Sequence, residues 1–265
     1  MIVANSWRPT LLLLIGSLVI AAAFFVDPIA QDPDYHRFVD QRRFLSIANT
    51  LNVLSNLPFV IVGVAGLIFI GRHGAGVAPH TQGAWLVFFT GIFLTAFGSG
   101  YYHLAPNNDT LVWDRLPMTI GFMSFVAIVI AEYLSVRGGK LALVPLLVVG
   151  AASVLFWAYT ESLGRGDLRA YAVVQFVPML LIPLILWLYR GKSDLGRYIV
   201  WMIGFYVGAK VLEHYDGQVY AATGLLSGHT LKHVFAALAP ASILYGLTRR
   251  RYHAARPHTP RTSSK

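Results

Sequence analysis

Residues 84–104 read AWLVFFTGIFLTAFGSGYYHL, and this stretch decides the class of fold. It contains no Lys, Arg, Asp or Glu, and a transmembrane helix needs about 20 mainly apolar residues to cross the hydrocarbon core of a bilayer. The rest of the chain holds more stretches of this kind. Together they predict eight membrane-spanning helices, at residues 10–26, 50–71, 84–104, 116–136, 141–158, 169–189, 198–213 and 226–247.

The composition of the whole chain indicates a membrane protein as well. Of its 265 residues, 12% are charged and 56% are apolar, and the mean hydropathy is +0.59. A soluble domain carries about 25% charged residues, which its solvent-facing shell requires. The chain has no cysteine, which excludes disulfide frameworks, thiolate metal sites and cysteine nucleophiles.

The distribution of the basic residues predicts the orientation in the membrane. The net charge of +9 does not indicate nucleic-acid binding, because six of the 21 Lys and Arg lie in the tail after Thr248. Thirteen Lys and Arg fall at the termini and in the even-numbered connections, against six in the odd-numbered ones. The positive-inside rule therefore places both termini in the cytoplasm.

Segment 10–26 has an alternative interpretation as a cleaved signal peptide, because Arg8 precedes an apolar stretch. However, Asp27 and Pro28 stand where a cleavage site needs small residues. This favours a helix that is not cleaved.

Three strings place polar side chains where lipid is expected. They are FGSGYYHLAPNN at 97–108, WDRLPMT at 113–119 and SGHTLKHVFAA at 227–237. Ionisable side chains are costly inside a bilayer, so each one is a hypothesis of function. Counting the predicted spans puts all three strings at the same, outer face of the membrane.

His229 and His233 are four residues apart, so their imidazoles share one face of a helix. A helix supplies two zinc ligands in this way, with a third ligand from elsewhere and an open fourth position. Taken alone, such a pair is more often two packed, hydrogen-bonded histidines. Because His103 is predicted in the same leaflet, a site of three histidines becomes geometrically possible.

The other polar residues of the spans have structural alternatives. Asp114 is predicted in the same leaflet as the histidines, where it is a candidate carboxylate of the site, or it is the N-cap of the helix predicted at 116–136. Ser99 is a candidate polar group of the same site, or a small helix-packing residue. Lys210 and Glu213 are one turn apart and predict an ion pair, and Lys232 either pairs with Glu213 or extends toward the interface.

Four strings of the chain resemble the alkaline ceramidase family: SNLPF at 55–59, GSGYYH at 98–103, WDRLPMT at 113–119 and SGHTLKH at 227–233. This family belongs to a superfamily of seven-helix membrane hydrolases that includes adiponectin-receptor-like and haemolysin III-like proteins. The resemblance covers residues 34–247. It implies a zinc-dependent amidase that cleaves the N-acyl bond of ceramide or a related lipid. It also implies zinc ligands and catalytic residues, namely the ligands His103, His229 and His233, the oxyanion-binding Ser99 and the acid/base group Asp114.

The resemblance also predicts how the chain is divided. We expect an all-α polytopic membrane protein with an N-terminal transmembrane helix and outer connection (1–33), a seven-helix hydrolase core (34–248) and a basic tail (249–265). The family has an acidic, calcium-binding segment before its first core helix. Here His36, Phe38 and Asn49 stand where oxygen ligands are wanted, so calcium is at most a second cofactor.

Two other classes of protein remain open at the level of sequence. A proton-coupled transporter also carries ionisable residues in its spans, but near the midplane in broken helices, whereas this cluster is predicted near one face. A non-catalytic, zinc-binding, receptor-like protein would share every feature above, and only an activity assay separates it from a hydrolase. For the hydrolase, the expected partner is an N-acyl lipid that enters from the bilayer.

Overall fold

The computed structural model describes residues 7–73 and 81–254, and in this part of the chain every regular element is a helix. Eight helices are long, as the sequence predicts. They are α1 (Trp7–Phe25), α3 (Leu57–His73), α4 (Gln82–Leu104), α5 (Asn108–Val129, continued by a π-helical turn at Ile130–Leu134), α6 (Val136–Ser162), α7 (Arg169–Leu188), α8 (Gly196–His214) and α10 (Gly228–Ala254). Three short helical elements lie in the connections: a 3₁₀ turn at Pro33–His36, α2 (Thr50–Leu54) and α9 (Asp216–Thr223).

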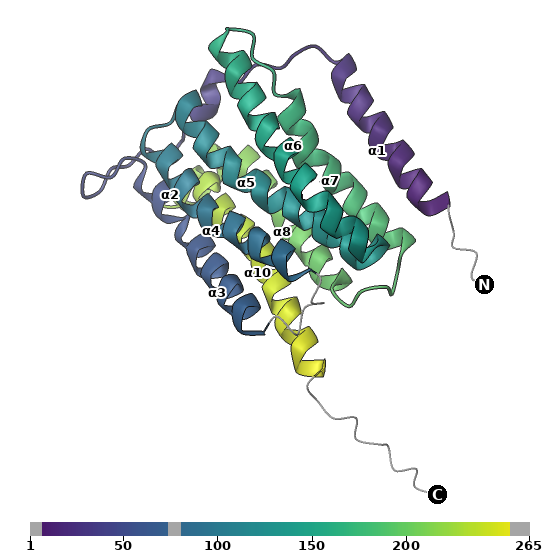
Figure 1. Ribbon diagram of the computed structural model, residues 1–265. Helices are drawn as coiled ribbons and strands as arrows, with labels where there is room; N and C mark the ends of the chain where they lie inside the picture. The colour runs from purple at the N-terminus through teal and green to yellow at the C-terminus, as the bar shows by residue number, and fades with distance from the viewer. Residues whose placement is uncertain (1–6, 74–80, 255–265) are drawn as a thin grey trace, which may run out of the picture.

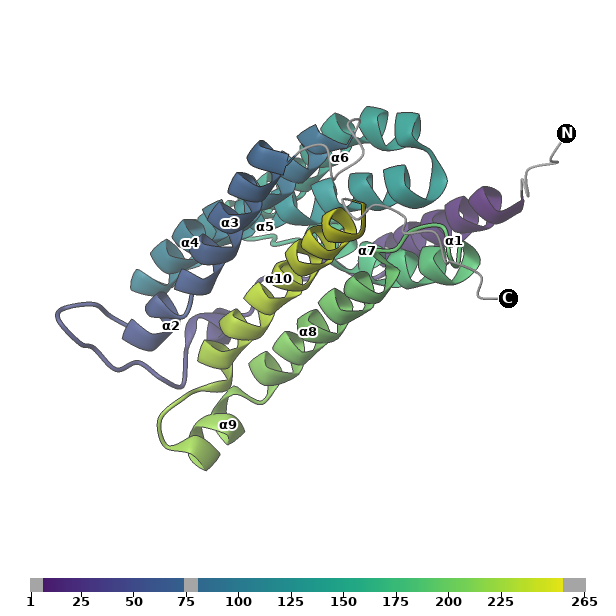
Figure 2. The ribbon, with the colours of Figure 1, turned by 90° about the horizontal axis from the view of Figure 1, so that it is seen from below.

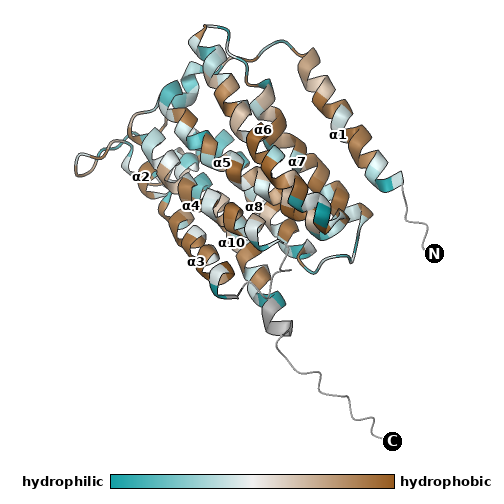
Figure 3. Cartoon of the chain, viewed as in Figure 1, coloured by the Kyte–Doolittle hydropathy of each residue, from teal (hydrophilic) through white to brown (hydrophobic). Residues whose placement is uncertain are grey.

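Seven of the described helices are long and apolar enough to cross a membrane, which confirms an all-α polytopic membrane protein. Hydrophobic residues dominate the long helices (Figure 3). The long helix that does not qualify is α8, which contains Arg197, Lys210 and Glu213. It nevertheless runs alongside α10 through the bundle (Figures 1 and 2), and its Glu213 pairs with Lys232 of α10.

Six helices form a closed ring around the interior of the bundle. Neighbouring contacts run from α3 to α4, α5, α7, α8 and α10, and α10 returns to α3. The helix α6 packs outside this ring, against α5 and α7. A cavity in the centre of the ring is therefore separated from the lipid on most sides by a full layer of helix.

The N-terminal helix α1 stands outside the seven-helix core, as predicted. It packs against α7, and most of its side chains are exposed, with Leu12 and Gly16 buried in that contact (Figure 1). The loop after α1 is fixed at its start, because Arg169 Nη1 donates to Val26 O at 2.6 Å. From there the loop crosses the end of the bundle toward α2.

The start of α5 differs from the sequence prediction. The helix begins at Asn108 rather than near residue 116, and Asn107 is its N-cap, in a capping box with Thr110. The charged residues Asp109, Asp114 and Arg115 lie in the first two turns, so a hydropathy pattern underestimates the length of this helix. Asp114 is thus an interior residue of α5, and the alternative that it caps the helix is wrong.

Candidate metal centre

The three histidines of the sequence prediction meet in one buried cluster. His103 lies at the end of α4, and His229 and His233 lie on one face of the first two turns of α10. His103 Nε2 is 3.2 Å from His233 Nε2 and 3.4 Å from His229 Nε2. All three side chains are at most 5% exposed. Among the described residues, these three histidines are the group that can hold a metal ion.

The spacing of these nitrogens fits a tetrahedral metal. Ligand nitrogens about 2.0–2.1 Å from a tetrahedral zinc ion lie about 3.3 Å from one another. Neutral imidazoles that point Nε2 atoms at a common centre bring lone pairs together, which is unfavourable in a dry site unless a cation lies between them. Three neutral imidazoles are a ligand set that suits zinc, and the chain has no cysteine that could supply a thiolate ligand.

Two partners on neighbouring elements orient the α10 histidines. His233 Nδ1 lies 2.7 Å from Ser55 Oγ, and the Ser55 hydroxyl donates in turn to Asn52 O at 3.1 Å. His233 can therefore donate from Nδ1 to Ser55 and keep Nε2 free as a ligand, which is the usual arrangement around a metal. The backbone N–H of His229 donates to Asp216 Oδ1 at 2.7 Å, which anchors the start of α10. No local spacing in the sequence indicates this role of Ser55, because 178 residues separate it from His233.

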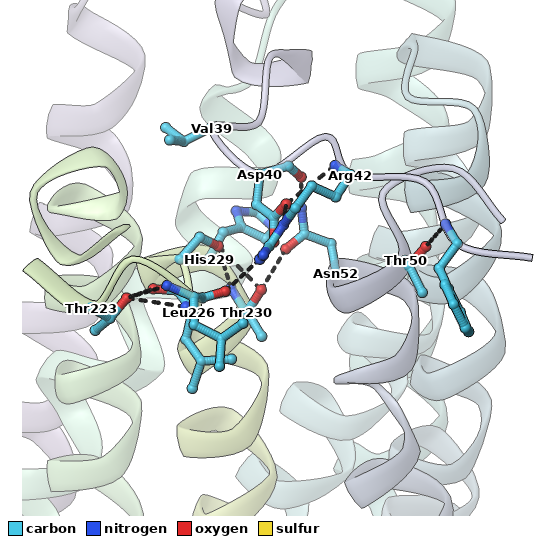
Figure 4. A network of polar contacts seen from close by, with 12 residues as sticks. Val39, Asp40, Arg42, Thr50, Asn52, Thr223, Leu226, His229 and Thr230 are labelled. Carbon is cyan, nitrogen blue, oxygen red and sulfur yellow. Dashed lines mark hydrogen bonds and ion pairs between the residues drawn. The ribbon is translucent and has the colours of Figure 1, made fainter. Parts of the chain in front are cut away.

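A polar network fixes the loop that covers the histidines (Figure 4). Thr230 Oγ1 donates to Asn52 Oδ1 at 2.9 Å, and Asn52 Nδ2 donates to the backbone oxygen of Asp40 at 3.3 Å. The Asp40 carboxylate accepts two hydrogen bonds of 2.8 Å from Arg42. These bonds hold the pKa of Asp40 below its usual range. The loop is thus tied to α10 through Asn52 of α2.

This loop places Phe38 over the cluster. The Phe38 ring is 5% exposed, and its centroid lies 4.7 Å from that of His103 and 4.6 Å from that of His229. In the neighbouring acidic segment, Asp34 pairs with Arg37. His36 contacts the Tyr102 hydroxyl and Asn108. Asp34 and His36 of this segment thus make their contacts within the protein.

Ser99 and Asp114 lie beside the histidines, at one end of a cavity of about 300 Å³. Ser99 precedes His103 by one turn of α4, and its hydroxyl is within hydrogen-bonding reach of the Asp114 carboxyl. Both side chains are at least nine-tenths buried, and both line the cavity together with His233. The structure brings together all five residues that the sequence analysis selected.

The remainder of the cavity is mostly apolar. It extends inward between the ring helices, and its deep part is lined by Phe88, Ile92, Phe125, Ile182, Met202 and Pro240. Phe88 and Ser99 are eleven residues apart on α4, so this part of the cavity runs along about 16 Å of helix. The cavity therefore joins a polar end at the histidines to a long apolar interior.

Charged side chains also line this cavity near its polar end. Glu213 accepts from Lys210 at 2.6 Å and from Lys232 at 2.7 Å, which confirms the predicted ion pair and the pairing of Lys232 with Glu213. The Tyr35 hydroxyl donates to Glu213 at 3.5 Å, and burial raises the pKa of Tyr35. Arg115, which the sequence analysis assigned to an outer connection, lies inside α5 and lines the same cavity.

The fold and the site together define a class: an all-α polytopic membrane protein with a buried group of three histidines that can hold a metal ion. No protein-family model and no curated protein matches the chain. The support for a function comes from the geometry of the site and from the sequence strings.

Proposed function

We propose that this protein is a zinc-dependent integral-membrane amidase that hydrolyses the N-acyl bond of ceramide or a related N-acyl lipid. One observation carries the proposal: three histidine nitrogens with zinc-like separations lie beside Ser99 and Asp114 at the polar end of an apolar cavity. The resemblance of four sequence strings to the alkaline ceramidase family supports the same activity.

His103, His229 and His233 would hold the zinc ion. An amide is a weak electrophile and water is a weak nucleophile at neutral pH, so hydrolysis needs both to be activated. Zinc supplies this chemistry, by polarising a carbonyl oxygen and by making a water molecule more acidic. Three neutral ligands leave the ion its full charge and one open position.

Asp114 is placed to move the proton. In the hydrolysis, the bond from carbonyl carbon to nitrogen breaks, a water oxygen joins the carbon, and one water proton must reach the departing amine. A carboxylate beside the histidines accepts that proton and then gives it to the nitrogen. The neighbouring Ser99 hydroxyl can donate a hydrogen bond to the negative charge that develops on the carbonyl oxygen.

The shape of the cavity supports a lipid substrate. Its apolar interior can hold an acyl chain, while the polar end receives the amide. The helices around the cavity and the Phe38 ring over His103 and His229 cover the histidine end of the site. A transporter is less well supported, because the polar cluster lies at the ends of α4 and α10 rather than at the middle of broken helices.

The substitution Asp114→Asn separates the role of Asp114 from that of the metal ligands. Zinc content and hydrolysis of an N-acyl lipid are measured on the purified variant. The amide is nearly isosteric and removes no ligand, so we expect zinc to stay and turnover to fall by at least about 10²-fold, the usual contribution of acid–base catalysis. Asp109→Asn is the matched control, because Asp109 is exposed in the first turn of the same helix.

A zinc-loaded Asp114→Asn protein with near-normal hydrolysis would remove Asp114 from the mechanism. A wild-type protein that holds zinc but cleaves no N-acyl lipid would indicate the non-catalytic, receptor-like alternative instead.

A further inference from the structure

Arg115 is a buried cation whose partners are almost all uncharged. Its side chain is 6% exposed, and Nη2 donates to Gln31 Oε1 at 2.6 Å. Three aromatic rings surround the guanidinium, with Cζ at 4.1 Å from the Trp157 centroid, 4.7 Å from that of Tyr171 and 5.9 Å from that of Tyr35. Cation–π contacts offset part of the cost of removing the charge from water.

One end of this guanidinium has no partner. Within residues 7–73 and 81–254, Nη1 of Arg115 is buried without a hydrogen bond, and no carboxylate lies within ion-pair distance of the side chain. A buried, unpaired donor on a charged group is costly, because water has been removed and nothing has replaced it. Since Arg115 lines the cavity, a ligand in the cavity can supply the missing acceptor.

The charges that line the cavity give the sign of that ligand. The cations are Arg115, Lys210 and Lys232, and the anions are Asp114 and Glu213, with both lysines paired to Glu213. The side chains of the lining therefore carry one positive charge in excess, before any metal ion is counted. A single carboxylate would neutralise it, and carboxylates form strong, charge-assisted hydrogen bonds with guanidinium groups.

We propose that Arg115 binds a carboxylate of the lipid headgroup, so that the preferred substrates are N-acyl lipids with a carboxylate close to the amide, such as N-acyl amino acids. This inference rests on the proposed function for the bond that is cleaved. Asp114 and Arg115 are consecutive in α5, and both line the polar end of the cavity. A short headgroup can therefore reach Arg115 while its amide lies beside Asp114 and Ser99.

The test uses two lipids that lack an amide and therefore cannot be hydrolysed: hexadecyloxyacetate, which carries a carboxylate, and the neutral hexadecyloxyethanol. Binding of each to the zinc-loaded protein is measured by displacement of a fluorescent fatty-acyl probe. Wild-type protein should bind the carboxylate at least about tenfold more tightly, which is the scale of one hydrogen bond to a charged group.

Arg115→Gln should reduce this preference to nearly none, and Arg115→Lys should retain part of it. Arg197→Gln is the matched control, because it makes the same substitution at an exposed arginine of α8 that does not line the cavity, and it should keep the preference. Zinc content and melting temperature show whether each variant is folded. Equal binding of the two lipids by the wild type, or an unchanged preference in folded Arg115→Gln, would overturn the proposal.

These outcomes are separate from those for the proposed function. A carboxylate preference that depends on Arg115, without hydrolysis of any N-acyl lipid, would contradict the amidase alone. Hydrolysis of neutral N-acyl lipids by a protein without the preference would contradict the role of Arg115 alone.

Discussion

At the scale of single residues, the hydrogen bond from His233 to Ser55 has a testable role. Ser55→Ala removes the acceptor at 2.7 Å from His233 Nδ1, so the ring loses its orienting partner although all three ligands stay. Loss of such a partner typically weakens metal binding by about 10-fold to 100-fold. We expect a loss of zinc affinity in this range, measured by competition with a chelator.

The control for this prediction is Ser124→Ala. Ser124 is also fully buried, but its hydroxyl donates only to carbonyl oxygens of its own helix, Ile120 O and Gly121 O. This variant should bind zinc as the wild type does. Equal affinities in the two variants would show that Ser55 does not act on the metal site.

Asp167 carries a prediction on pH. Hydrogen bonds from Arg169, at 2.9 and 2.8 Å, hold the pKa of the Asp167 carboxyl below its usual range. A group whose pKa is lower in the folded state stabilises the fold above its unfolded pKa, about 3.9, and this contribution is lost as the pH falls through the folded value. The melting temperature of Asp167→Asn should therefore fall less between pH 5 and pH 3, about one unit either side of that pKa, than that of the wild type. Parallel curves for the two proteins would contradict this role.

At the scale of elements, the contact of α4 with α5 positions the site. A Cβ atom added at Gly98 would lie 2.0 Å from Trp113 O, so the two helices can approach this closely only with glycine at that position. Gly98→Ala must separate α4 from α5 beside Ser99 and Asp114. Overpacking typically costs about 1–3 kcal/mol, so we expect a lower melting temperature and lower hydrolysis.

Gly100→Ala is the matched control for Gly98, two residues along the same helix. A Cβ at Gly100 meets nothing within 4 Å, and alanine is favoured over glycine in a helix by up to about 1 kcal/mol. This variant should be neutral or slightly stabilising. If both variants behaved alike, the close approach of α4 and α5 would not matter for the site.

The elements also show what the sequence could predict and what it could not. The long apolar stretches predicted the helices. The spacing of His229 and His233 predicted that both lie on one face of a helix. The order of the spans predicted His103 at the same end of the bundle. The start of α5 was missed because its first two turns contain three charged residues, which lower the local hydropathy. Arg115 was missed because its aromatic partners come from the first loop, α6 and α7, and no local spacing brings such distant residues together.

At the scale of the whole molecule, the bundle has two distinct ends. The first residues of α1 and the last of α10 lie at one end, and the metal site, at the end of α4 and the start of α10, lies at the other (Figure 1). The excess of Lys and Arg at the termini supports the proposal that the end of the bundle with the site faces the outer leaflet.

Reporter fusions test this orientation. Fusions after residues 38 and 110 should report the outer side, and a fusion after residue 192 should report the cytoplasm. A fusion after residue 224, between α8 and α10, should also report the outer side if α8 spans the membrane. A cytoplasmic signal at 110 would reverse the proposed orientation of the site.

The measurement that tests the account most directly is the zinc content of the purified protein, determined together with hydrolysis of an N-acyl lipid, for the wild type, His229→Ala and His214→Ala. His229 is one of the three converging histidines that can hold a metal ion, whereas His214 is exposed at the end of α8. The account predicts about one zinc per chain and hydrolysis for the wild type and His214→Ala, and loss of both for His229→Ala. Full zinc and undiminished hydrolysis in His229→Ala would contradict it.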